Sequence, residues 1–131
     1  MSTLRATLTN IQSVENLNIV TFASEGSTLK MMSLELHKKL KKGTEVLLSC
    51  KPTAVAIAKD ITGGLSYSNQ LHATIVSMEM GQLICSLELD FHGSMIESII
   101  TSDSAKRLNL QLNDNVTALI KSTDLAIGKI L

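Results

Sequence analysis

Leu4-Arg5-Ala6-Thr7-Leu8 reappears 67 residues later as Leu71-His72-Ala73-Thr74-Ile75. A longer pair of matching stretches lies near the end of each half. The stretch in the first half is Val46-x4-Lys51-Pro52-Thr53-Ala54-Val55-Ala56-Ile57-Ala58-Lys59. It matches a stretch 70 residues later, Val116-x4-Lys121-Ser122-Thr123-Asp124-Leu125-Ala126-Ile127-Gly128-Lys129. A repeat of this length predicts two copies of one small domain.

The repeat divides the chain into a first unit over residues 1–60, a linker with its opening motif over residues 61–69, and a second unit over residues 70–131. In the second unit, residues 83–91 alternate between apolar and polar side chains, which predicts a half-buried strand. The other strands expected there cover residues 71–77, 95–100, 116–121 and 125–130. The first unit repeats this order, with strands expected over residues 4–13, 19–23, 28–32, 45–50 and 55–59.

A short helix is expected before the fourth strand of each unit. In the second unit, residues 101–108 begin with capping hydroxyls and end with two cations, which is typical of one or two helical turns. Residues 34–40 are expected to be helical in the first unit. The predicted fold class is therefore mainly β, with two tandem OB-like five-stranded small barrels, each with one short helix.

Composition limits the function classes. Hydrophobic residues make up 44% of the chain and aromatic residues 2%, so the core must be aliphatic. A formal net charge of zero and the scarcity of aromatic platforms argue against a nucleic-acid partner. Cys50 and Cys85 lie within apolar runs, which predicts buried free thiols. No signal peptide or membrane-length apolar run is visible, so we expect a cytoplasmic protein without a membrane partner.

Catalytic and metal-binding patterns are weak in this sequence. His37, His72 and His92 show no metal-ligand spacing, so no metal-ligating residues are predicted. No phosphate loop, nucleophile motif or acid pair stands out, so we expect no catalytic residues and no enzyme activity. The remaining signal is a set of donors at element ends: Ser66, Ser68, Asn69, Gln70, Thr101, Ser102, Ser104, Lys121, Ser122 and Thr123. Such donors suit an anion site at a helix start, but they equally suit ordinary caps and turns.

Three stretches carry a family resemblance. They are Ser66-Tyr67-Ser68-Asn69-Gln70-Leu71, Ile100-Thr101-Ser102-Asp103-Ser104-Ala105 and Val116-Thr117-Ala118-Leu119-Ile120-Lys121-Ser122-Thr123-Asp124-Leu125. Together they resemble the molybdenum-pterin-binding (Mop) family, which includes the molbindins and the related TOBE-type oxyanion-sensing domains. The second copy is similar over nearly its full length, and the whole chain resembles a di-domain molbindin.

This resemblance implies a cytoplasmic molybdate- or tungstate-binding protein that acts in storage, homeostasis or sensing and needs no organic cofactor. Its anions are expected between subunits of a homo-oligomer, with a trimer of two-domain chains favoured. The implied oxyanion-binding residues are Ser66, Ser68, Asn69, Thr101, Ser104, Lys121 and Ser122. In the first copy, the corresponding but weaker candidates for oxyanion binding are Ser33 and Lys51.

Two departures from the family pattern bear on affinity. The family often has arginine where this chain has Ser68, and loss of a guanidinium removes a bidentate clamp for an oxyanion. In the first copy, Leu36 stands where the second has Ser104, and Pro52 stands where it has Ser122. Proline has no backbone N–H to donate. The first copy is thus expected either to bind an anion weakly or to serve only as an architectural partner.

Two further functions are hypotheses at this stage. The alternative to storage is a regulatory interaction module that uses oxyanion binding to control a protein partner, for which an exposed apolar patch would be a mark. An OB-like nucleic-acid binder is disfavoured by the neutral charge and the lack of aromatic residues.

Overall fold

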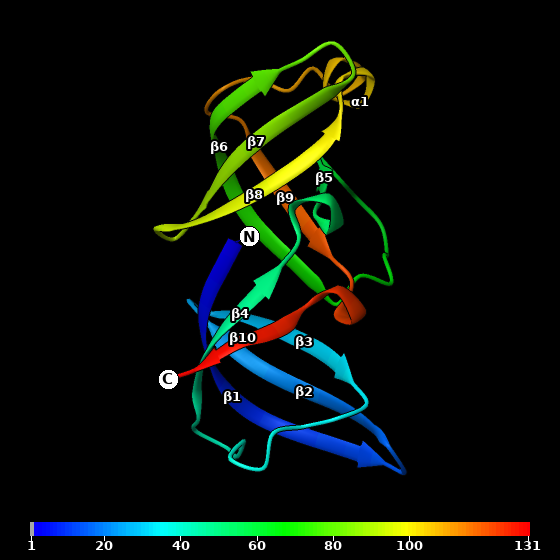
Figure 1. The fold of residues 1–131 in the computed structure, drawn as a ribbon. Coiled ribbons are helices and arrows are strands. Elements are labelled where there is room, and N and C mark those ends of the chain that lie inside the picture. The colour runs from blue at the N-terminus through cyan, green and yellow to red at the C-terminus, as the bar shows by residue number, and fades with distance from the viewer. Residues whose placement is uncertain (1) are drawn as a thin grey trace.

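The computed structural model describes residues 2–131, which form two antiparallel five-stranded sheets, one above the other along the long axis of the molecule (Figure 1). The strands of the first half are β1 (Ser2–Val14), β2 (Leu17–Ser24), β3 (Ser27–Ser33), β4 (Glu45–Cys50) and β5 (Ala56–Ala58). Those of the second half are β6 (Asn69–Met80), β7 (Ile84–Phe91), β8 (Ser94–Thr101), β9 (Asn115–Ile120) and β10 (Ala126–Ile130). The predicted mainly-β class is confirmed.

The fifth strand of each half belongs to the sheet of the other half. The sheet orders are β10-β4-β1-β2-β3, which we call lobe 1, and β5-β9-β6-β7-β8, which we call lobe 2. The repeat predicts each fifth strand in its own unit, whereas each sheet takes its fifth strand from the other half, so the sheets do not follow the repeat boundaries. A unit of about 60 residues buries little surface by itself. Exchange of the fifth strands therefore lets each half complete the core of the other.

The inward-facing pattern of the strands repeats between the lobes. In β7, Cys85, Leu87, Leu89 and Phe91 are buried as the alternation predicts, whereas Leu83 precedes the strand and is 82% exposed. The register shifts between Leu8 and Asn10 in β1 and between Ile75 and Ser77 in β6, which are equivalent positions in the repeat. These matching bulges bend the two long strands in the same way.

Both lobes have the aliphatic core that the composition requires. The largest fully buried side chains are Phe22, Phe91, Leu4, Leu8, Leu29, Leu48, Leu71, Ile75, Leu87, Leu89, Ile96 and Ile120. Cys50 and Cys85 are free and buried, as predicted, and burial raises the pKa of both thiols. Both thiols therefore stay protonated at neutral pH.

The expected helix of the second half is present as α1 (Ser102–Arg107), but that of the first half is not. Residues 34–44 form turns instead, so the prediction of a helix over 34–40 is wrong. Thr101 caps α1 by accepting the Ser104 N–H at 3.1 Å. Ser33 instead donates to the Glu35 carbonyl oxygen at 2.6 Å, and Leu36 offers no second hydroxyl. Short 3-10 turns, η1 (Pro52–Ala54) and η2 (Ser122–Asp124), follow β4 and β9.

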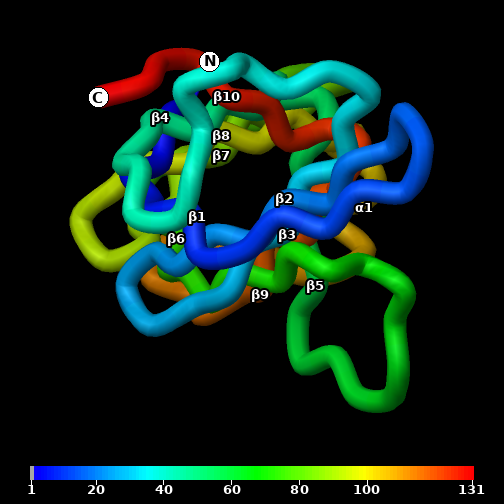
Figure 2. Tube along the Cα trace, turned by 90° about the horizontal axis from the view of Figure 1, so that it is seen from below, coloured from blue at the N-terminus to red at the C-terminus, as the bar shows by residue number. Residues whose placement is uncertain are grey.

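The connection between β5 and β6 projects from the body of the molecule (Figure 2). It holds almost all of the expected linker, whereas Asn69 is already the first residue of β6. Ser66 and Ser68 are exposed in this connection. The opening motif therefore leads directly from an exposed loop into a central strand of lobe 2.

Candidate oxyanion site

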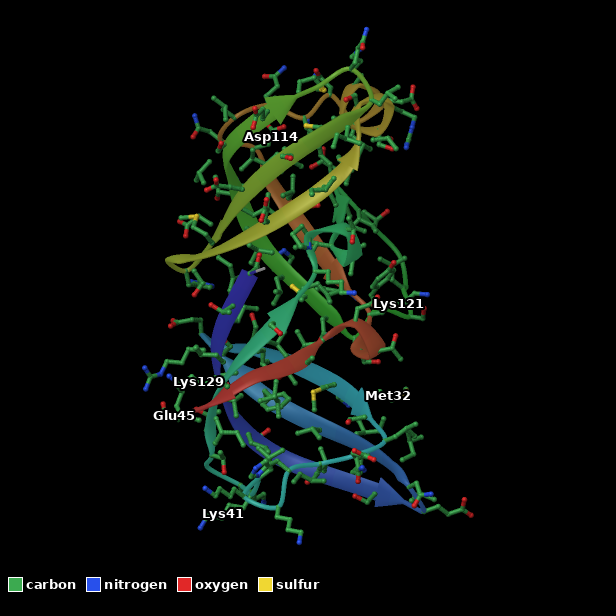
Figure 3. All side chains as sticks on the ribbon, in the orientation of Figure 1. Met32, Lys41, Glu45, Asp114, Lys121 and Lys129 are labelled. Carbon is green, nitrogen blue, oxygen red and sulfur yellow. The ribbon has the colours of Figure 1, made fainter. Side chains whose placement is uncertain are left out.

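The opening motif and the closing motif lie at the same end of lobe 2. Asn69 pairs with Ile120 in the β6–β9 ladder, so Ser68 and Lys121 follow at the same end of this strand pair. Figure 3 shows Lys121 beside the junction of the two lobes. Ser68 and Lys121 are both exposed. This end of lobe 2 thus offers a hydroxyl and an ammonium group to solvent.

Asn69 has a different part from the one that the resemblance implies. Its side chain is fully buried, its Oδ1 accepts the Lys30 N–H at 2.7 Å, and its Nδ2 donates to the Lys30 carbonyl oxygen at 2.9 Å. Because this side chain is completely buried and both of its polar ends are bonded to Lys30, the second hydrogen on Nδ2 is not exposed to an oxyanion. We therefore correct its assignment as a direct side-chain ligand: Asn69 ties β6 to β3 and positions the opening motif.

The closing motif presents donors at the start of η2. Lys121 precedes this turn, Ser122 is half-buried and Thr123 is exposed. The Asp124 N–H donates to the Lys121 carbonyl oxygen at 2.9 Å, which fixes the turn. Neither of the two ion pairs formed within residues 2–131 involves Lys121. Its charge is therefore not neutralised by a carboxylate of the described chain.

The weaker candidate Lys51 lies where the two closing motifs meet. A hollow of about 250 Å³ is lined by residues from both halves: Ser49, Cys50, Lys51, Ala54, Thr123, Asp124 and Ala126. Lys51 and Thr123 are donors, but Asp124 brings an acceptor that repels an anion. The exchange of the fifth strands is what carries Thr123 to this place.

The helix start forms a separate polar cluster. The Thr101 hydroxyl donates to Ser104 Oγ at 2.9 Å, and Arg107 Nη2 donates to the same oxygen at 3.1 Å. Thr101 is thus a helix cap, as the simpler interpretation predicted. Sequence reasoning missed Arg107, although its spacing of three residues from Ser104 on a helix was a usable signal.

The helix cluster and the closing motif lie at opposite ends of lobe 2. Thr101 pairs with Ile84 beside the Met80 end of β6, whereas Lys121 lies beside the Asn69 end. These ends are separated by a 12-residue strand, which spans roughly 35 Å at about 3.3 Å per residue. One small anion cannot touch both groups within one chain. A site that uses both groups needs a second chain.

Other functional features are few in the described part of the chain. No group of three or more His, Cys, Asp or Glu side chains within residues 2–131 is arranged to hold a metal ion. No helix in this range is long and apolar enough to span a membrane. Ser33, the last candidate, lies at the end of β3 and lines a groove in lobe 1 together with Thr123.

Comparison with known proteins places this chain in a family. The TOBE domain family matches residues 65–127, which run from the opening motif to the close. Molybdenum-pterin-binding protein 1 of Clostridium pasteurianum is 36% identical over 64 residues, which are 48% of this chain and 94% of that protein. The chain belongs to the molybdenum-pterin-binding protein family. A probable molybdenum-pterin-binding protein of Haemophilus influenzae is 31% identical over 65 residues, which are 49% of this chain and 94% of the relative.

The fold of this molybdenum-pterin-binding family member extends beyond the matched half. The crystal structure of the cytoplasmic molybdate-binding protein ModG, with molybdate bound, superimposes with a TM-score of 0.90. The match covers 97% of this chain and 94% of that one at 24% identity. The two-lobed architecture is therefore shared over nearly the whole chain, including the divergent first copy.

Proposed function

We propose that this chain binds molybdate or tungstate in the cytoplasm, for storage, homeostasis or sensing, at sites between subunits of a homo-oligomer. One observation carries the proposal: the donors of the helix start and those of the close lie at opposite ends of lobe 2. Neighbouring chains in a closed ring, with a trimer favoured, would bring the two ends together. The names of the relatives, which describe binding proteins, support a role without catalysis.

The chemistry of the donors fits a fully ionised dianion. Molybdate carries no proton at neutral pH, so its oxygens only accept hydrogen bonds. Hydroxyls of Ser66, Ser68, Ser104 and Ser122 and the ammonium of Lys121 can all donate. Hydrogen phosphate also carries an O–H, and since none of these groups is a carboxylate, only a serine hydroxyl turned to accept could satisfy it, which favours the fully ionised dianion. Arg107, bonded to Ser104, can supply the guanidinium that position 68 lacks.

Native mass spectrometry and calorimetry with molybdate test this proposal. We expect a closed oligomer that gains discrete molybdate masses and gains none from phosphate. Lys121→Ala should weaken binding at least about tenfold, because a hydrogen bond to a charged group contributes about 1.5–3 kcal/mol. Lys41→Ala, in an exposed loop of lobe 1 (Figure 3), is the matched control. Unchanged binding by Lys121→Ala would refute the site, and an oligomer that takes up no oxyanion would refute the function.

The regulatory interaction module has one structural observation in its favour. The turn between β6 and β7 exposes three apolar side chains: Met80, Leu83 and Ile84. Such a patch is a mark of contact with another protein. A protein partner that binds Leu83→Ser as well as the parent, with and without molybdate, would exclude this patch as its docking site.

A further inference from the structure

Lobe 1 contains a groove that lies apart from the candidate oxyanion residues of lobe 2, although the weaker candidate Ser33 lines it. The groove has a volume of about 610 Å³ and lies between β3, residues 33–40 and β10. Figure 3 marks its two sides by Met32 on β3 and Lys129 on β10. Because β3 and β10 are the end strands of their sheet, the groove follows the open side of lobe 1.

The floor of the groove is apolar. Met31 and Leu125 are buried beneath it, and the half-buried side chains that pack on the core around it are Leu36, Leu40, Ile127 and Ile130. Lobe 2 is closed at the equivalent place, where the buried Ser98 hydroxyl donates to the Val55 carbonyl oxygen at 2.6 Å. Met31 stands 67 residues before Ser98 and cannot make that bond. A groove of this volume with an apolar floor is in the size range of small-molecule sites.

Donors surround this floor. His37 Nδ1 accepts the Lys39 N–H at 3.1 Å, so a neutral His37 ring carries its proton on Nε2 and can donate from there. Lys129 and Thr123 add an ammonium and a hydroxyl, and Glu35 is the one carboxylate that lines the groove. The lining segment also continues into four exposed lysines: Lys38, Lys39, Lys41 and Lys42.

Lys129 is free because the repeat has diverged. Its counterpart 70 residues earlier, Lys59, is paired with Asp114 at 3.0 Å. The residue equivalent to Asp114 in lobe 1 is Thr44, which accepts the Lys41 N–H at 3.2 Å but carries no charge. Lys129 takes part in neither ion pair found within residues 2–131. Its ammonium group therefore has no carboxylate partner within residues 2–131.

We propose that this groove binds an amphipathic organic anion, with its apolar body on the floor and its carboxylate or phosphate at Lys129 and His37. Molybdate is not this ligand, because it has no apolar surface to cover the floor. The site is separate from the proposed oxyanion site, although Thr123 lies next to Ser122 of the closing motif.

Displacement of the fluorescent dye anilinonaphthalene sulfonate from the intact protein tests the proposal. Decanoate or decyl phosphate should displace the dye from one site per chain, and the tighter of the two identifies the head group. Decanol should compete about tenfold more weakly, because it lacks the charge-assisted contact. Molybdate and inorganic phosphate should not compete. Equal competition by decanol, or no displacement by either anion, would overturn the proposal.

Two pairs of variants localise the site. Lys129→Met should lower the affinity for decanoate about fivefold. Lys106→Met, on α1 of lobe 2, should leave this affinity unchanged. Met32→Glu should abolish binding, whereas Met95→Glu, at a similarly exposed methionine of lobe 2, should not. Native mass spectrometry of all four variants checks the assembly. Loss of the oligomer in Met32→Glu alone would mean that a second copy covers the groove, which would refute the ligand site.

Discussion

The two lobes are built from one repeat, yet they differ where the end strands of each sheet approach each other. In lobe 2, Ser98 bonds to Val55, and α1 follows β8 directly. In lobe 1, Met31 replaces the serine and turns replace the helix, which leaves a groove. The two lobes therefore share their strand order and differ in the contacts at this place, where lobe 2 has the Ser98–Val55 hydrogen bond and lobe 1 has the groove.

Charge has diverged along with packing. Residues 1–60 contain eight basic and five acidic residues, whereas residues 61–131 contain four basic and seven acidic ones. The lysine-rich turn over residues 38–42 accounts for much of this asymmetry. Since the formal net charge of the chain is zero, the asymmetry is invisible in the overall composition. Since the first half supplies four of the five strands of lobe 1, we expect anions to be attracted more strongly to the surface of lobe 1 than to that of lobe 2.

The largest difference in the free energy of unfolding is expected between variants that remove the hydrogen bonds joining the two lobes. Asn69 makes two hydrogen bonds to the Lys30 backbone, whereas its counterpart Ser2 makes one, accepting the Glu97 N–H at 2.6 Å. Asn69→Ala should lower the free energy of unfolding by about 3 kcal/mol, and Ser2→Ala by about 1 kcal/mol, because buried partners lose their bonds. Urea unfolding at one fixed protein concentration measures both. Equal losses would show that the two ties are equivalent.

The hydrogen bonds between Asn69 and Lys30 could not be predicted from the sequence. The alternation in β7 and the repeated motifs are local patterns, so they predicted the strands, the fold class and a hydroxyl cap at the start of the helix over residues 101–108. The bond from Asn69 to Lys30 joins residues 39 apart, and no local pattern announces it. From the sequence alone, the Asn69 amide could not be distinguished from an exposed hydrogen-bond donor.

Two fold features escaped prediction for related reasons. β5 and β10 are short strands, and their sequences fit the edge of either sheet, so only the three-dimensional arrangement reveals the exchange. The expected helix over residues 34–40 followed from similarity to the second copy. The cap that nucleates α1 is the Thr101 hydroxyl, and Leu34 stands at the matching position of lobe 1, 67 residues earlier in the register that β3 shares with β8. Similar apolar spacing was not sufficient without that cap.

Lys51 is followed by Pro52, and Lys121 is followed by Ser122. Exchanging proline and serine between these two positions should change oxyanion binding. Ser122→Pro removes a hydroxyl and a backbone N–H from the stronger motif, so we expect molybdate affinity to fall about tenfold. Pro52→Ser adds the same donors beside Lys51 and should increase the number of molybdate ions bound per chain. Calorimetric titration gives both quantities. An unchanged stoichiometry in Pro52→Ser would indicate that Asp124, which lines the hollow with Lys51, keeps anions out.

Alanine substitutions at Thr101 and at Ser33, which end the third strand of each half, should differ in their effect on the free energy of unfolding. Thr101→Ala removes the cap of α1 and should lower the free energy of unfolding by about 1 kcal/mol. Ser33→Ala removes a hydroxyl that begins no helix, and we expect an effect of less than about 0.5 kcal/mol. Thermal unfolding without added oxyanion separates this effect from ligand binding. A larger loss in Ser33→Ala would mean that its bond to Glu35 organises the whole 34–44 segment.

The smallest expected effect depends on pH. The pKa of Asp114 is lowered first by the hydrogen bond from the Gln111 N–H and then by Lys59. A lowered folded-state pKa means that the carboxylate stabilises the fold above its unfolded pKa, near 3.8, and that this stability is lost as the pH falls through the folded value. Asp114→Asn should therefore be less stable than the parent at neutral pH and should converge with it in acid.

Thr44, the lobe 1 counterpart of Asp114, provides the control for that pH dependence. It caps its turn without a charge, so Thr44→Ala should differ from the parent by the same amount at neutral and acid pH. Unfolding by urea across the acid range measures the two differences side by side. If the Asp114→Asn difference stayed constant with pH, the ionised form of Asp114 would not stabilise the fold. The paired Lys59 and the unpaired Lys129 would then differ in geometry but not through a stabilising ion pair.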